Sequence, residues 1–172
     1  MVTSAMECKL NVKPLMGYMM HTEFWEGHCR GGIREEMTPE AEKARGAAYF
    51  EKYKEALSQL PAEINLMEPM MVPYVEDFVV SDELVEQIQK ELPEIDYILV
   101  LYQRIPKIER FKKPVISFTH TVSAADTCAY PRHIGFEAYY PIDAPELVEL
   151  MHLLWVRKAV SKTRALILSA GE

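Results

Sequence analysis

The stretch IDYILVLY, residues 95–102, decides the fold that we expect for this chain. It is short and almost continuously apolar, and a basic polar segment, residues 103–113, follows it. A run of this kind is typical of a strand that is covered on both faces, because a strand with one wet face alternates apolar and polar residues. Strands covered on both faces occur in parallel sheets flanked by helices. The stretch therefore favours an α/β domain.

The N-terminal third of the chain supplies a second strand and the best-defined helix. Residues 10–20 form an apolar run that we predict to be a strand. Thr38 then begins a helix as its N-cap, and Pro39 follows at the first helical position, where its missing N–H does no harm. Apolar residues recur at helical spacing from there until Pro61. A polar segment of unusual length separates the strand from the helix.

The remaining segments continue the alternation of strands and helices. A strand is predicted at residues 63–72, with Pro69 as an interruption, and Ser81 or Asp82 caps the helix that follows. Further strands are predicted at residues 114–118, 134–139 and 164–169, and a last helix begins after Asp143. This order predicts an open, mostly parallel sheet of about five strands in a three-layer α/β/α sandwich of the Rossmann-like or flavodoxin-like kind.

Length and composition indicate one soluble domain that spans residues 1–172. The net charge of -7 argues against nucleic acid as a partner, because phosphate binding depends on clustered Lys and Arg. No apolar run is long enough to cross a membrane, and the N-terminus lacks the apolar core of a signal peptide, so we expect a cytoplasmic protein. Three well-separated cysteines fit a reducing compartment. The chain stops directly after the last predicted strand, and we expect it to be an N-terminal domain or a fragment.

Polar segments follow the predicted strands, and in a parallel sheet such segments meet at the carboxyl edge, where ligands bind. Donors, acceptors and Arg side chains gathered there would suit a polyhydroxylated or anionic small molecule. The polar residues that we expect at this edge, counting 119–133 as a loop, are His21, His28, Arg30, Arg34, Gln103, Arg104, His120, Thr121, Asp126, Thr127, Arg132 and His133.

Several alternative sites have little support in the sequence. The chain contains no GxGxxG turn and no P-loop, which argues against a dinucleotide or nucleotide site of those kinds. Ser117, His120 and Asp126 lack the GxSxG elbow that would position a nucleophile. A small metalloenzyme that uses His21, Glu23 and His120 is left open, although this spacing is unspecific.

The segment CRGGIREE, residues 29–36, resembles the opening of the L-fucose isomerase and L-arabinose isomerase superfamily, in particular the fucose isomerases. A Gly-Tyr pair at residues 17–18 precedes it and an Ala-rich helix follows it, as in that family. The later strings DYILVL, KPVISF, PIDAPEL and RALILSAG come in the same order as the family's elements. The resemblance covers most of the chain as an order of elements, and its most specific string is residues 30–35.

The resemblance implies a substrate-wall and oligomerisation domain of a sugar aldose–ketose isomerase. It implies closed homo-oligomers, in which this domain reaches a sugar bound at a neighbour's active site, and a divalent metal, usually Mn²⁺. The family's metal-binding and acid/base residues lie in later domains, so the resemblance implies that this chain alone is inactive. A stand-alone flavodoxin-like module that binds a small sugar or carboxylate is the alternative. The substrate-binding residues that we expect are Trp25, His28, Arg30, Arg34, Gln103 and His120.

Overall fold

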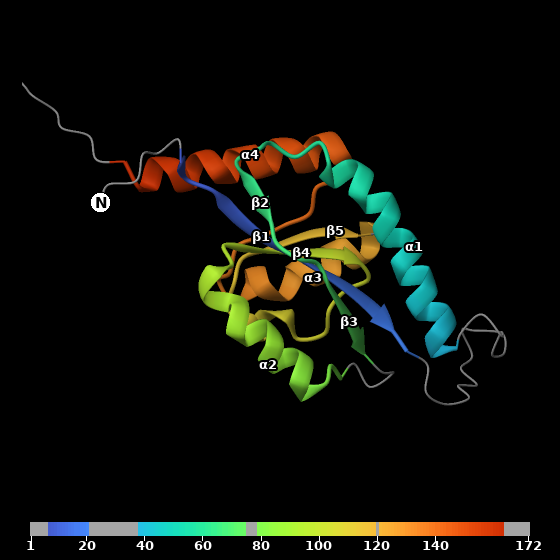
Figure 1. Cartoon of the computed structure of the whole chain (residues 1–172). Coiled ribbons are helices and arrows are strands. Elements are labelled where there is room, and N and C mark those ends of the chain that lie inside the picture. The colour runs from blue at the N-terminus through green and yellow to red at the C-terminus, as the bar shows by residue number, and fades with distance from the viewer. Residues whose placement is uncertain (1–6, 21–37, 75–78, 120, 164–172) are drawn as a thin grey trace, which may run out of the picture.

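The computed structural model describes residues 7–20, 38–74, 79–119 and 121–163 (Figure 1). The strand predicted at residues 164–169 lies outside these ranges. The described elements alternate as expected for an α/β domain. They are the strands β1 (Leu10–Met19), β2 (Ile64–Leu66), β3 (Met70–Tyr74), β4 (Tyr97–Tyr102), β5 (Val115–Thr119) and β6 (Ala138–Tyr139), the helices α1 (Pro39–Leu57), α2 (Asp82–Glu91), α3 (Thr121–His133) and α4 (Ala144–Ser161), and the 3-10 turns η3 (Leu92–Glu94) and η4 (Ile108–Phe111).

All pairings between the named strands are parallel, in the order β2-β1-β4-β5-β6, and β3 pairs with β1 beyond β2. Leu10 pairs with Ile64 but Leu15 pairs with Met70, so the outer chain advances six residues while β1 advances five. The interruption predicted at Pro69 is therefore a one-residue insertion, and β2 and β3 together occupy the place of one strand. Counted in this way, the order is that of flavodoxin-like folds, 2-1-3-4-5.

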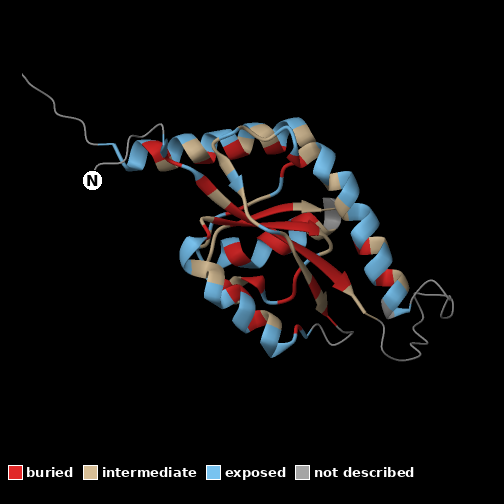
Figure 2. Ribbon diagram, in the orientation of Figure 1, coloured by how far each residue is buried: buried red, intermediate tan, exposed pale blue. Residues whose placement is uncertain are grey.

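Helices cover both faces of the sheet, which confirms the predicted three-layer sandwich. Figure 1 shows α4 above the sheet and α2 below it. Side chains of α1 and α4, among them Leu57, Leu147 and Met151, pack with one face of β1 and β4. Side chains of α2, η4 and α3 pack with the other face, which includes Val100 and Val115. Burial is concentrated in the strands, coloured red in Figure 2.

Local sequence explains why the helices begin where they do. The side chains of Thr38, Ser81 and Asp143 each accept a hydrogen bond from a backbone N–H in the first turn of α1, α2 and α4. These contacts satisfy amide donors that a helix start leaves without partners. The N-caps predicted from the sequence are confirmed in all three helices.

The prediction of a polar loop over residues 119–133 is wrong, because most of this segment is helix α3. The buried side of α3 is made of small or weakly apolar residues, namely Ala124, Thr127, Cys128 and Pro131. Residues of this kind produce almost no apolar periodicity, so the helix has a weak signature in the sequence. The residues at positions 126, 127, 132 and 133 therefore lie on a helix and not in a loop at the carboxyl edge.

Candidate functional site

The carboxyl ends of four strands meet at one edge of the sheet, where β1, β3, β4 and β5 end at Met19, Tyr74, Tyr102 and Thr119. Met20, which precedes the polar segment 21–37, directly follows β1, and Thr38, which follows the segment, is the N-cap of α1. Several predicted site residues lie outside the described ranges: His21, Glu23, Trp25, His28, Arg30, Arg34 and His120. Gln103 is described, and it lies at this edge directly after β4.

The strand order places a topological switch point between β1 and β4. The connection from β1 leads to β2 and β3 on one side, whereas the connection from β4 leads to β5 on the other. In open α/β sheets, connections that diverge in this way leave room outside the carboxyl ends of the two strands, and ligands bind in this position. Gln103 therefore lies where the fold favours a ligand.

The side chain of Gln103 crosses the end of β1 and joins three strands. Its Oε1 accepts a hydrogen bond from the backbone nitrogen of Met19 at 2.8 Å and another from the hydroxyl of Tyr74 at 3.2 Å. A backbone N–H can only donate, so the atom that it meets must be the amide oxygen, and the orientation of the amide group is fixed. The Nε2 group forms no hydrogen bond with another described residue.

The backbone before Gln103 is strained. Tyr102 has a φ of 66°, a value that bulky residues rarely adopt, and the nitrogen of Gln103 donates to the carbonyl of Leu101 at 2.9 Å. A hydrogen bond between residues two apart with positive φ at the middle residue defines a strained γ-turn. Backbone strain of this kind concentrates at functional sites, where the surrounding structure holds it in place.

Helix α1 contributes a polar and aromatic wall beside the γ-turn. The ring of Tyr102 stacks on Tyr49 with 4.5 Å between centroids, and the backbone nitrogen of Tyr102 donates to the hydroxyl of Tyr53 at 3.3 Å. Arg45 donates to the buried carboxylate of Glu42 at 2.6 Å. Burial, and then the Glu42 carboxylate, raises the pKa of Tyr102. Tyrosine is therefore neutral here and can donate a hydrogen bond at physiological pH.

Sequence reasoning did not find this wall, although a signal was present. Glu42, Arg45, Tyr49 and Tyr53 recur at spacings of three, four and four, which places them on one side of α1. Only the apolar members of that face were used to predict the helix. The polar members lie at the end of α1 that begins at the carboxyl edge, and their helical spacing alone does not show what they contact.

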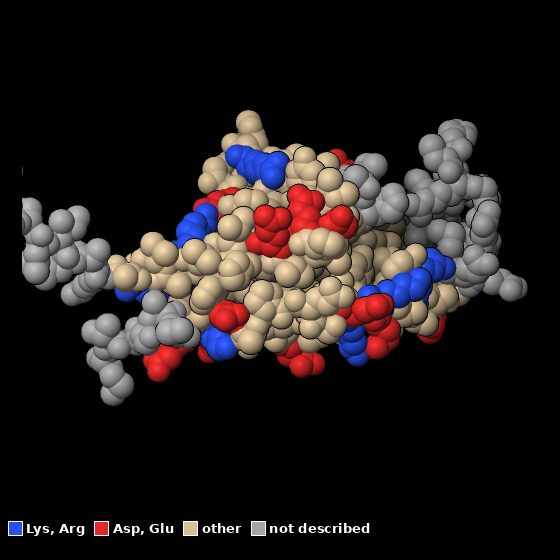
Figure 3. Space-filling model, turned by 90° about the horizontal axis from the view of Figure 1, so that it is seen from above, with Lys and Arg blue, Asp and Glu red and all other residues tan. Residues whose placement is uncertain are grey.

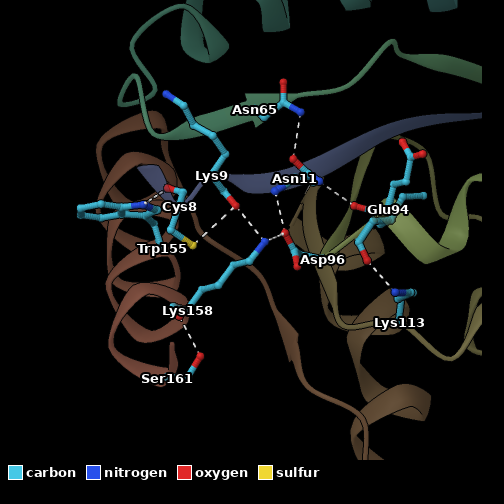
Figure 4. A network of polar contacts seen from close by, with 11 residues as sticks. Cys8, Lys9, Asn11, Asn65, Glu94, Asp96, Lys113, Trp155, Lys158 and Ser161 are labelled. Atoms are coloured by element: carbon cyan, nitrogen blue, oxygen red, sulfur yellow. Dashed lines mark hydrogen bonds and ion pairs between the residues drawn. The ribbon is translucent and has the colours of Figure 1, made fainter. Parts of the chain in front are cut away.

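A second group of polar side chains lies at the opposite, amino edge of the sheet. Lys158 on α4 contacts Asp96 and also donates to the carbonyl of Lys9 at 2.8 Å, and Asp96 accepts from the backbone nitrogen of Asn11 at 2.7 Å (Figure 4). Trp155 donates to the carbonyl of Cys8 at 2.7 Å. The charged groups are paired with one another, so this network fastens α4 to the start of β1.

Next to this network, Arg157 forms hydrogen bonds with Glu137 and with the hydroxyl of Tyr97. These three residues line a cavity of about 480 Å³ together with Lys158 and Asp96. The hydrogen bond from Arg157 lowers the pKa of Glu137, whereas burial raises the pKa of Tyr97. The cavity walls thus carry balanced charges and present no surplus charge to a ligand.

The described part of the chain contains no group of three or more His, Cys, Asp or Glu side chains that could hold a metal ion. None of its helices is both long and apolar enough to span a bilayer. The carboxyl edge at the switch point, with Gln103 and the wall on α1, is the candidate site. No protein-family model, curated protein or solved structure matches this chain.

Proposed function

We propose that this chain binds a small polyhydroxylated or carboxylated molecule at the carboxyl edge, between the ends of β1 and β4. The observation that carries the proposal is Gln103, whose amide is oriented by Met19 and Tyr74 at the switch point of the fold. A few well-placed polar groups beside aromatic rings are the usual composition of a small-molecule site. Tyr102 and Tyr49 supply the rings.

More narrowly, we propose a substrate-wall and oligomerisation domain of a sugar aldose–ketose isomerase-like protein. The resemblance of residues 30–35 to the fucose isomerases supports this, as does a flavodoxin-like strand order. In this role Arg30 or Arg34 contacts a substrate hydroxyl. The acid/base residues and the Mn²⁺ or other divalent metal that polarises the substrate oxygens belong to another part of the assembly. The chain alone is then expected to be inactive as an isomerase.

Backbone NMR titrations of the ¹⁵N-labelled chain test the binding site. L-fucose, L-arabinose and gluconate are added separately, and the amide signals of Met19, Tyr74 and Gln103 are followed. Shifts at these three amides are expected, because the backbone nitrogen of Met19 and the hydroxyl of Tyr74 both donate to the side-chain oxygen of Gln103. Shifts confined to Glu137 and Arg157 at the amino edge, or no shifts at millimolar ligand, would contradict the proposal.

The substrate-wall role and the stand-alone module differ in affinity. A wall that forms only part of a pocket buries little of its ligand and is expected to bind it weakly, at millimolar concentration, whereas a complete pocket buries most of the ligand and binds more tightly. Calorimetry with the same panel separates the two. The variants Arg30→Ala and Arg34→Ala are expected to weaken sugar binding in either case, and Arg157→Ala at the amino edge serves as the control.

We also propose that the chain forms a homo-oligomer through the outer face of α4. Leu153, Val156 and Val160 are 57%, 37% and 64% exposed, and they lie in one line on the side of α4 opposite to the buried Met151. At spacings of three and four these residues form a contiguous apolar patch, whereas apolar residues that are scattered singly over a surface need no explanation. In the view of Figure 3, uncharged side chains form most of the surface and charged side chains form small separate groups.

A second copy of the chain is the proposed partner because this apolar line is self-complementary. Antiparallel pairing of two copies close to Val156 places Leu153 of each copy beside Val160 of the other. Sedimentation velocity is expected to show a dimer or larger species that Leu153→Glu dissociates. Ile142→Glu, at an exposed apolar residue before α4, is the matched control. A wild-type monomer at high micromolar concentration would exclude this interface.

A further inference from the structure

We infer that Gln103 selects ligands that meet it with an oxygen acceptor, such as a carboxylate or carbonyl group, and discriminates against ligands that meet it with an ammonium group. The inference rests on the proposed function, because it specifies which chemical group is bound at the carboxyl edge. It follows from the contacts of the Gln103 amide group, whose oxygen is occupied and whose nitrogen is available.

The acceptor end of Gln103 is already occupied. An amide oxygen has two lone pairs, and Oε1 accepts two hydrogen bonds, from the nitrogen of Met19 and from the hydroxyl of Tyr74. The backbone nitrogen of Met19 is fixed by the sheet, since Met19 ends β1, and the side chain of Tyr74 at the end of β3 is held by burial, with 3% exposed. A ligand therefore finds no vacant lone pair on this side chain, and a ligand ammonium group has nothing to donate to.

The donor end of Gln103 is available. Its Nε2 carries two N–H groups that form no hydrogen bond with any described residue. Within the described ranges, the buried side-chain polar atom without a partner is Nε of Arg110, so Nε2 of Gln103 is not sealed inside the protein. A side chain that offers donors alone favours oxygen acceptors, and a charged acceptor such as a carboxylate gains the most.

Neighbouring groups have the same preference. The hydroxyl of Tyr102 is neutral at physiological pH, as for an ordinary tyrosine, and burial raises its pKa further, while Arg45 beside it is a pure donor. Among the described residues, the carboxylate that acts on both of them is Glu42, which is 3% exposed and already accepts a hydrogen bond from Arg45. The described polar groups of α1 and Tyr102 thus provide donors on their side of this edge and keep their carboxylate inside.

The substitution Gln103→Glu tests the inference with little change of shape. One carboxylate oxygen can still accept from Met19 and Tyr74, whereas the second oxygen replaces the amide nitrogen and turns a donor into an acceptor. Gln59→Glu is the control, because Gln59 is exposed beyond the end of α1 and the substitution changes the net charge equally. Gluconate and glucosamine are the probes, and calorimetry and amide NMR measure their binding.

The expected result is a reversal of preference. Wild type and Gln59→Glu bind gluconate better than glucosamine, and Gln103→Glu weakens gluconate binding at least about tenfold while it strengthens glucosamine binding. If both probes bind at the edge and Gln103→Glu behaves like Gln59→Glu, the inference is overturned and the proposed function stands. If neither probe, nor a neutral sugar, binds to wild type, the proposed function fails and the inference fails with it. Retention of the Met19 amide signal verifies that the variant is folded.

Discussion

Gly17 lies so close to Gln103 that a Cβ atom at residue 17 would stand 2.7 Å from the carbonyl oxygen of Gln103 and 2.8 Å from that of Arg104. The chain after β4 folds back over β1 at this point, and the two backbones form an isolated bridge between Gly17 and Gln103. Only glycine permits this approach, because the atoms in the way are backbone atoms that cannot rotate aside. The backbone geometry of the candidate site therefore depends on the absence of a side chain at residue 17.

Gly17→Ala is expected to lower the free energy of unfolding by about 2 kcal/mol or more, as overpacking of a close contact does. The matched control is Gly46→Ala on α1, where the added Cβ would meet only the flexible end of Met71 and alanine improves helix propensity. Urea unfolding of both variants measures the two changes in unfolding free energy. Equal effects at the two positions would show that the backbone contact at Gly17 is not tight.

Lys13 and Glu91 form an ion pair that is unequally buried. Lys13 is 2% exposed in the middle of β1, and its Nζ lies 2.5 Å from the carboxylate of Glu91 on α2, whose side chain is 32% exposed. Glu91→Gln is expected to cost about 1–2 kcal/mol, because it leaves a buried cation without its counter-charge. Lys13→Met is expected to cost less, since it removes the charge and keeps the apolar stem. Urea midpoints that rank the two variants in the opposite order would contradict this account.

Most of the sheet could be predicted from the sequence, because a strand that is buried on both faces needs a nearly continuous run of apolar residues. In β4, the five residues from Tyr97 to Leu101 are all buried, and the same run made the strand recognisable in the sequence. The caps were equally visible, since Thr38, Ser81 and Asp143 act on residues three positions away. The local sequence therefore reveals interactions between residues a few positions apart, and it also reveals a strand that is buried on both faces.

Features that depend on distant parts of the chain could not be predicted. Helix α3 packs through Ala124 and Cys128, and the small size of these residues is meaningful only beside β5 and β6. The strain at Tyr102 likewise has no sequence signature, because a tyrosine at positive φ is tolerated only where its surroundings hold it. Gln103 was predicted as a site residue from its place after a strand, whereas its partners Met19 and Tyr74 are 84 and 29 residues away.

Lys112 ends η4 in the left-handed conformation, with a φ of 52°, and its side chain is exposed. A side chain at this φ costs roughly 1 kcal/mol that glycine avoids, and the greater freedom of glycine in the unfolded chain cancels part of the gain. Lys112→Gly is therefore expected to raise the unfolding free energy by about 0.5 kcal/mol. Lys90→Gly, in the last turn of α2, is expected to lower it by about 1 kcal/mol. Thermal melts of the two variants should shift in opposite directions.

The ion pair between Arg157 and Glu137 is expected to stabilise the fold less as the solution becomes acidic. The hydrogen bond from Arg157 lowers the pKa of Glu137 below its ordinary 4.5, so the unfolded chain takes up a proton at a higher pH than the folded chain does. The stabilisation is present above pH 4.5 and is lost as the pH falls through the lower, folded-state pKa. Both side chains are about half exposed, 52% and 44%, which limits the effect to less than about 1 kcal/mol.

Urea unfolding of wild type and Arg157→Gln at about pH 7 and pH 3 measures this loss. A stability difference is expected at neutral pH, and it should shrink at low pH, because protonated Glu137 no longer attracts the guanidinium. Lys54→Gln removes the cation of a more exposed surface pair with Glu51 and should change stability little at either pH. A difference for Arg157→Gln that stays the same in acid would mean that Arg157 stabilises the fold mainly through Tyr97, whose hydroxyl it also contacts and which stays neutral at both values.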